Sequence, residues 1–183
     1  MNTISEVLDQ TFAFEPFFPE QRMLPTEFLV RDLESEIGVF LPPEYRSFVL
    51  RYGGTAPSID KDRTPAVWVD GRKDLIVGRY FLGFFSPKPA PHLQQFDLRR
   101  AYQDWKSLIG ASFLPIMTGE GDAMFCLKLT GERKGSIWAW LRDPVDINTE
   151  WENIQEEWGL YSVAPDVLAF VCLFQEFMRP TQD

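Results

Sequence analysis

Few residues in this chain have the type and spacing that catalysis requires. His92 is the only histidine, and it lies in a proline-rich segment with no nucleophile signature around it. Nucleophilic catalysis by serine or cysteine usually needs a histidine base. Asp122, at a predicted turn, and Asp143, after the next predicted strand, form the one pair of carboxylates that a hydrolase could use as acid and base. Acidic residues at hairpin ends usually stabilise turns, so a carboxylate-dependent hydrolase is the least favoured hypothesis.

The sequence contains no motif for a metal or a nucleotide cofactor. Zinc needs three or four closely spaced ligands, and neither a paired Cys motif nor a His-x-x-x-His helix is present. Gly119 and Gly121 are too few for a dinucleotide-binding loop, and no glycine-rich loop ends in Gly-Lys-Ser or Gly-Lys-Thr. Cys126 and Cys172 each lie in an apolar run, which predicts two buried thiols and no disulfide. We expect neither a cofactor nor a metal site.

A block of acidic and aromatic residues near the C-terminus is better suited to binding a protein. Trp151 and Trp158 are seven residues apart and would share one face of a helix. Aromatic anchors beside carboxylates suit an interface with a basic partner, whereas the alternative is that both rings pack on the core. Trp138 and Trp140 have the same two interpretations, with the core favoured. The candidate partner-binding residues are Asp122, Asp143, Trp151, Glu152, Glu156, Glu157 and Trp158.

Composition and charge exclude several classes of protein. A chain of 183 residues with 45% hydrophobic and 25% charged residues fits one globular domain. Its formal charge of -9 argues against nucleic-acid binding and suits a basic protein partner. No apolar segment reaches the roughly 18 residues that a membrane span needs, and the first residues lack the pattern of a signal peptide. We therefore expect a cytoplasmic protein, monomeric or weakly dimeric, that has no contact with membranes.

Hydrophobic periodicity predicts helices on both sides of a central sheet. Apolar residues at helical spacing predict helices within residues 26–38, 43–54, 97–110 and 165–178. Apolar runs bounded by turns predict strands within residues 66–69, 75–77, 79–85, 113–117, 123–129 and 137–141. These elements predict an α+β fold, a single domain with a mostly antiparallel, twisted sheet flanked by helices. We assign residues 26–183 to this domain and residues 1–25 to a packed, phenylalanine-rich extension.

Three segments resemble the SUKH (Smi/Knr-like) superfamily. In the family, the first part of the domain is a short helix that ends in Gly, followed by Leu-Pro and by a second helix that carries Tyr and Phe and ends at Gly-Gly. The segment LVRDLESEIGVFLPPEYRSFVLRYGG is similar to this pattern. The segments FLPIMTGEGDAMFCLKLTGERKGSIWAWLRD and VAPDVLAFVCLFQEFM resemble its later signature and its closing helix. The matching structural positions are Leu41, Pro42, Tyr45, Phe48, Gly53 and Gly54. We expect Tyr45 and Phe48 to face the core and Gly53 to adopt a positive φ.

The resemblance implies a binding function without catalysis. Most family members are bacterial immunity proteins against secreted or contact-delivered polymorphic toxins, and fungal relatives are linked to cell-wall regulation. We therefore expect a protein that neutralises a toxin with a basic surface by direct binding. The alternative is a regulatory or scaffold module without a toxin partner. Asp122 matches the family's Gly-Asp turn, where it either stabilises the turn or contributes to an acidic partner surface.

Overall fold

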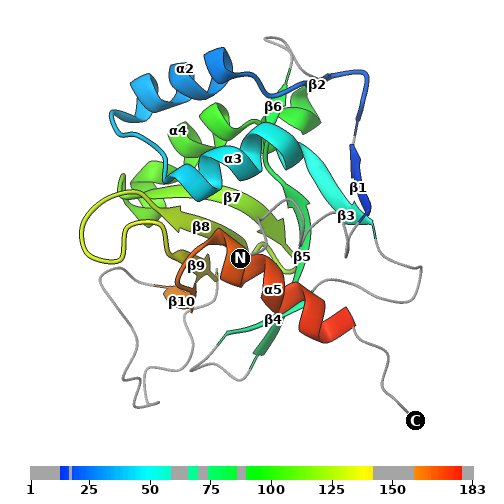
Figure 1. Ribbon diagram of the computed structural model, residues 1–183, viewed down its shortest axis with the longest axis vertical. Coiled ribbons are helices and arrows are strands. Elements are labelled where there is room, and N and C mark those ends of the chain that lie inside the picture. The colour runs from blue at the N-terminus through cyan, green and yellow to red at the C-terminus, as the bar shows by residue number, and fades with distance from the viewer. Residues whose placement is uncertain are drawn as a thin grey trace.

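The fold is built on a six-stranded antiparallel sheet with the strand order β10-β9-β8-β7-β5-β4 (Figure 1). A computed structural model of the chain describes residues 13–16, 18–58, 66–69, 74–85, 90–141 and 159–178. The strands of this sheet are β4 (Ala66–Val69), β5 (Asp74–Phe81), β7 (Phe113–Gly119), β8 (Met124–Lys128), β9 (Ile137–Trp140) and β10 (Leu160–Ala164). The helices are α2 (Glu27–Ile37), α3 (Pro43–Tyr52), the 3-10 helix η1 (Pro91–Phe96), α4 (Leu98–Ile109) and α5 (Val167–Met178).

Both faces of the sheet are covered. Every residue of β8 and β9 is buried, and successive side chains of a strand point to opposite faces. Helix α4 packs against β7, whereas α5 contacts the edge strands β4 and β10, which also contact each other. In Figure 1, α2, α3 and α4 gather on one side of the sheet and α5 lies in front of it. The predicted α+β fold with a mostly antiparallel sheet is therefore confirmed.

Capping residues mark the ends of the predicted helices. The Thr26 hydroxyl accepts a hydrogen bond from the Leu29 N–H at 3.3 Å, and Gly38 ends α2 with a φ of 77°. The Asp97 carboxylate accepts bonds from the first backbone N–H groups of α4. Asp166 caps α5 in the same way, through a 2.8 Å bond from the Ala169 N–H. Within the described ranges, no helix has the length and apolar character to cross a membrane.

A buried glutamate holds the loop that joins α2 to α3. The Glu34 side chain is 6% exposed, and its Oε1 accepts a 2.9 Å hydrogen bond from the Leu41 N–H. Arg46 places its Nε 3.6 Å from the same oxygen, which compensates the buried charge. Tyr45 and Phe48, on the first two turns of α3, are buried as the sequence predicted. The geometry of the loop that precedes α3 thus depends on the Glu34 carboxylate, seven residues before Leu41.

Three glycines allow two backbone segments to touch behind α3. Gly53 has a φ of -58°, so the predicted positive φ at this position is wrong; Gly54 has it instead, at 75°. Gly53 is required for space, because a Cβ there would lie 2.7 Å from the Val49 carbonyl oxygen. A Cβ on Gly83 would lie only 2.3 Å from the Gly54 nitrogen. The chain after β5 therefore passes directly over the end of α3.

This crossing divides a strand that the sequence predicted as continuous. The predicted strand over residues 79–85 is two strands, because β5 ends at Phe81 and β6 (Phe84–Phe85) pairs with β2 (Arg22–Met23) in another sheet. Between them, Gly83 bridges to Asp97 just before α4. The edge strand β10 was not predicted, and its register with β9 is irregular between Ser162 and Ala164.

The chain before α2 also contributes strands. β1 (Ala13–Pro16) pairs antiparallel with β3 (Thr55–Ser58). The Phe14 ring lies with its centroid 4.4 Å from that of Tyr52 and 6.2 Å from that of Phe81. Residues 13–16 are thus bound to β3 through their backbone, and the Phe14 ring contacts the end of α3 and β5. The domain boundary between residues 25 and 26 stays a prediction.

Substitution of Gly83 by alanine tests the backbone crossing. The added methyl group would collide with the backbone of Gly53 and Gly54, which cannot rotate away as a side chain can. We expect Gly83→Ala to lower the free energy of unfolding by at least about 3 kcal/mol, measured by urea denaturation.

Gly38→Ala is the matched control. Gly38 has a φ of 77°, but a Cβ there would have nothing within 4 Å. The cost of the substitution therefore comes from the backbone conformation alone. Its cost should be about 1 kcal/mol. Equal losses in the two variants would show that the crossing imposes no steric constraint of its own.

Candidate functional site

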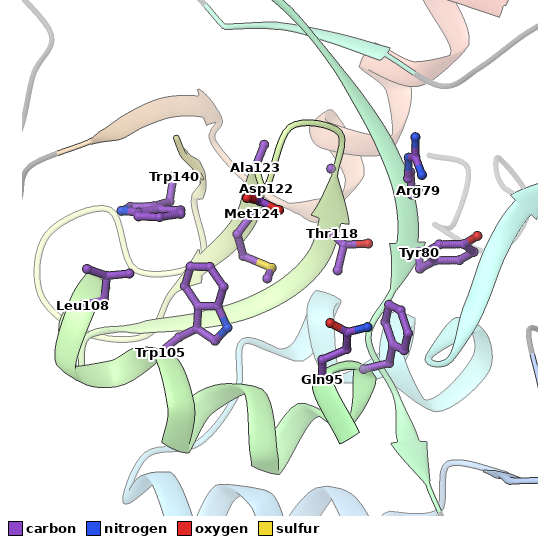
Figure 2. A pocket seen from close by; sticks show the side chains of 12 residues that line it. Arg79, Tyr80, Gln95, Trp105, Leu108, Thr118, Asp122, Ala123, Met124 and Trp140 are labelled. Carbon is purple, nitrogen blue, oxygen red and sulfur yellow. The ribbon is translucent and has the colours of Figure 1, made fainter. Parts of the chain in front are cut away.

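A pocket of about 550 Å³ opens between the helical segment η1–α4 and the sheet (Figure 2). This volume is within the range of sites that bind small molecules or inserted side chains, roughly 300–1,000 Å³. Its walls come from β5, η1, α4, β7, β8 and β9, so residues far apart in the sequence meet here. The lining residues used below are Arg79, Tyr80, Gln95, Phe96, Trp105, Leu108, Thr118, Asp122, Met124 and Trp140.

Two pairs of aromatic rings form opposite walls of the pocket. On one side, the Trp105 and Trp140 rings meet edge to face with their centroids 5.0 Å apart. On the other side, Tyr80 and Phe96 form a similar pair at 5.5 Å. Figure 2 shows Leu108 beside the tryptophan wall, and this leucine is 57% exposed. A partner that enters the pocket would therefore contact large, rigid rings on both sides, which is the composition of a binding hot spot.

The floor of the pocket carries a polar atom with no hydrogen-bond partner. Thr118 and Met124 are direct cross-strand neighbours on β7 and β8. The Thr118 Oγ1 is buried and makes no hydrogen bond with the described residues. A buried hydroxyl without a partner costs about 1–3 kcal/mol. In Figure 2, Thr118 lies between the two aromatic walls.

The rim carries one ion pair and one further carboxylate. Arg79 Nη2 lies 2.7 Å from Glu120 Oε1, and both side chains are about half exposed. Asp122 follows at the turn of the β7–β8 hairpin, where Gly121 and Asp122 have φ values of 62° and 61°. The Ala123 N–H closes this turn by donating to the Glu120 carbonyl oxygen at 3.1 Å. The rim therefore carries the Arg79–Glu120 ion pair and the carboxylate of Asp122.

Asp97 fixes the wall that η1 and α4 provide. Its Oδ1 accepts bonds from the Arg99 and Arg100 N–H groups at 3.0 and 3.2 Å, and its Oδ2 accepts one from the Phe85 N–H at 3.0 Å. Hydrogen bonding to Asp97 also raises the pKa of the Arg99 guanidinium, which remains charged. This buried carboxylate therefore joins β6 to the start of α4 and fixes the position of Phe96, the residue before it.

The structure places one of the predicted partner-binding residues in this pocket. Asp122 adopts the left-handed turn conformation and lies exposed at the rim, so its geometry fits both roles that the sequence left open. The remaining candidates lie outside the described residues, so the approach of Asp143 to Asp122 and the shared face of the two tryptophans stay predictions. These candidates are Asp143, Trp151, Glu152, Glu156, Glu157 and Trp158.

The core interpretation of Trp138 and Trp140 is confirmed, with a difference between them. Trp138 is fully buried, and its Nε1 donates a 2.8 Å hydrogen bond to the Ser136 hydroxyl. Trp140 is 7% exposed and belongs to the tryptophan wall of the pocket. Both tryptophans lie on β9, but Trp140 is the one whose ring contacts that of Trp105 on α4.

Sequence reasoning missed most of the pocket. Trp105 is one of the apolar positions in the helix predicted over residues 97–110. The structure leaves it partly buried against the core, whereas Leu98, Ala101, Tyr102 and Ile109 are fully buried. One signal was available: Trp105 and Leu108 are three residues apart and would form a second apolar stripe beside the first. Tyr80, Phe96 and Thr118 offered no such signal, since each was one apolar or neutral residue within an expected element or loop.

The two cysteines lie outside the lining of the pocket. Neither cysteine forms a disulfide. Cys126 is buried as predicted, whereas Cys172 is partly exposed, which corrects the prediction for that residue. Burial raises the pKa of the Cys126 thiol, so its nucleophilic thiolate is suppressed at neutral pH. Across the described parts of the chain, no three His, Cys, Asp or Glu side chains cluster in a way that could hold a metal ion.

Replacing Thr118 by valine tests whether its hydroxyl lacks a partner. Valine keeps the branched shape in a strand and removes the unpaired oxygen, so the free energy of unfolding should rise by about 1 kcal/mol. Thr55→Val is the control, because the Thr55 hydroxyl is buried but donates a 2.6 Å bond to the Tyr52 carbonyl oxygen. That variant should lose about 1 kcal/mol in the same urea titration. A loss for Thr118→Val would show that water or another group satisfies the hydroxyl.

Comparison with known proteins gives one family match. The model of the SMI1 / KNR4 family (SUKH-1) matches residues 24–166, well over half of the chain. The matched range includes the Glu34–Leu41 loop, the glycine crossing and every residue that lines the pocket. The curated proteins contain no match to this chain. The chain therefore belongs to the SMI1 / KNR4 family (SUKH-1).

Proposed function

We propose that this protein is a non-enzymatic immunity protein of the cytoplasm that neutralises a protein toxin by binding it directly. The observation that carries the proposal is the open pocket with two aromatic walls on a chain of net charge -9. Membership of the SMI1 / KNR4 family supports the proposal. The resemblance of the sequence to the SUKH superfamily implies a binding function. In this proposal the toxin binds at the pocket, and the net negative charge of the chain attracts a basic toxin.

The physical argument for a protein partner rests on how interfaces distribute their energy. A few aromatic side chains in a well-packed depression contribute most of the binding free energy at many interfaces. Trp105 and Trp140 have this character, and the half-exposed Leu108 extends their apolar surface outward. Charge outside the contact then acts mainly on the association rate.

The acidic block near the C-terminus belongs to the same proposal as a second contact region. Trp151 and Trp158 would act as anchors, whereas Glu152, Glu156 and Glu157 would attract basic residues of the toxin. Asp143 extends this negative region toward the end of β9 in the sequence. Variants in the acidic block and in the pocket test the two parts of the proposed interface individually.

Binding to neighbouring gene products tests the proposed function. The chain would be co-expressed with the protein encoded next to it on either side, and the complex measured by pull-down and calorimetry at 50 and 300 mM salt, which spans strong and weak screening. We expect a one-to-one complex whose affinity falls at the higher salt concentration. Absence of binding to either neighbour would contradict the immunity function and favour a regulatory module.

Charge reversal tests the acidic block within that complex. The triple variant Glu152→Lys, Glu156→Lys, Glu157→Lys should slow association at least about tenfold at low salt, with an unchanged thermal unfolding midpoint. The control carries the same charge change at the exposed residues Glu20, Glu44 and Glu132, which lie outside the block. Equal slowing in both variants would mean that net charge alone acts, and unchanged association would place the interface elsewhere.

A further inference from the structure

We infer that the aromatic pocket receives an uncharged aromatic side chain, such as phenylalanine, presented by a loop of the partner protein. The inference rests on the proposed function, since it assumes a protein partner, and it adds which kind of side chain the pocket recognises. Three observations carry it: rings on both walls, a lining whose formal charges cancel and an exposed apolar residue beside the opening.

The charges of the lining favour a neutral occupant. Arg79 and Asp122 are the two charged residues of the lining, so their formal charges cancel. The Arg79 guanidinium lies 2.7 Å from Glu120 Oε1, and Asp122 likewise has a partner. A charged guest would therefore lose its hydration without an uncommitted opposite charge among the lining residues to compensate the loss. A neutral side chain has no such cost.

The walls favour an aromatic occupant over an aliphatic one. The two ring pairs described above present aromatic surface from both sides. A guest ring can pack face or edge against these rings, and such contacts stabilise aromatic pairs beyond the burial of apolar area. Figure 2 shows the Met124 thioether extending from β8 toward the space between the walls, and a thioether makes favourable contacts with ring edges. An aliphatic guest would gain only the burial of its surface.

The opening of the pocket favours a side chain carried by a loop over a free small molecule. Leu108 lies beside Trp105 at the edge of the pocket, and it is 57% exposed. This apolar surface would remain in water if a small molecule filled the pocket alone, whereas the residues that flank an inserted side chain would cover it. A volume of about 550 Å³ holds one large side chain together with part of the backbone that carries it.

Charge complementarity describes the surroundings of the inserted ring on the partner. The lining is formally neutral, yet the chain has a net charge of -9, so its excess negative charge lies outside the pocket. Basic residues of the partner would therefore lie around the inserted ring and not at its tip. At many interfaces an aromatic anchor is enclosed in this way by polar contacts that exclude water.

Titration with short capped peptides tests the pocket without any partner. The probes are acetyl-Gly-Phe-Gly-amide and the same peptide with cyclohexylalanine, which keeps the six-membered ring and removes its aromatic electrons, followed by arginine and glutamate versions. The readout is the indole N–H signals of Trp105 and Trp140 in NMR spectra, assigned with tryptophan-to-phenylalanine variants. We expect the phenylalanine peptide to bind in the millimolar range, about fivefold more tightly than the cyclohexylalanine peptide and at least about tenfold more tightly than the charged peptides. Its affinity should be the same at 50 and 300 mM salt, because salt does not screen a neutral guest.

Two variants locate the binding. Trp105→Leu removes one ring and keeps an apolar side chain, so it should weaken the binding of the phenylalanine peptide about tenfold, followed through the Trp140 signal. Leu108→Ser changes an exposed position that contributes little to folding, and it should weaken the same binding about threefold. Phe40→Leu is the control, because Phe40 is 79% exposed and lies outside the lining. This variant should bind the peptide like the unaltered protein.

The outcomes separate this inference from the proposed function. Equal or tighter binding of the cyclohexylalanine, arginine or glutamate peptide, or full affinity of both pocket variants, would overturn the aromatic site, even if the neighbouring gene product binds. If no neighbour binds but the phenylalanine peptide binds with the expected preference, the pocket chemistry stands and the immunity function fails. With a partner in hand, Trp105→Leu should raise the dissociation rate of the complex at least about tenfold. An unchanged dissociation rate would overturn the inference and leave the proposed function intact.

Discussion

The close contact between Gly83 and the Gly53–Gly54 pair is the constraint on which the rest of the structure depends. No side chain separates these backbones, and the Gly54 N–H donates to the Leu82 carbonyl oxygen at 3.3 Å. The crossing ends β5, starts β6 and directs the chain into η1 and α4 on the same side of the sheet. Because α4 carries Trp105 and η1 carries Phe96, two walls of the pocket are positioned by a contact that involves neither ring.

Buried carboxylates extend this constraint to the neighbouring loops. Asp97 accepts hydrogen bonds from β6 and from α4, and Glu34 accepts one from the loop before α3. Each carboxylate faces an arginine, Arg99 or Arg46, which compensates the cost of burying its charge. Hydrogen bonds to charged groups are stronger than those between neutral groups, so these carboxylates stabilise both loops. The fold thus relies on local electrostatics where backbone segments meet without regular pairing.

Sequence patterns predicted those parts of the fold that depend on local chemistry. Thr26, Gly38 and Asp97 each mark a helix end through bonds to the adjacent turn, and all three were placed correctly. The patterns failed where contacts between distant segments determine the structure. The division of β5 from β6 depends on Gly83 meeting Gly54, and β10 is a short edge strand with an irregular register, so neither leaves a periodic signal. Only one of the predicted partner-binding residues, Asp122, lies in the described part of the chain.

The pocket shows why aromatic composition alone did not reveal a binding site. Trp138 and Trp140 are two residues apart on one strand, yet only Trp140 meets a ring from α4 and helps to line an opening. The difference arises from tertiary placement and not from residue type. Thr118 is another position that residue type does not explain, since packing alone would favour a valine where a hydroxyl is buried. Among the described residues, no group offsets the cost of burying this hydroxyl.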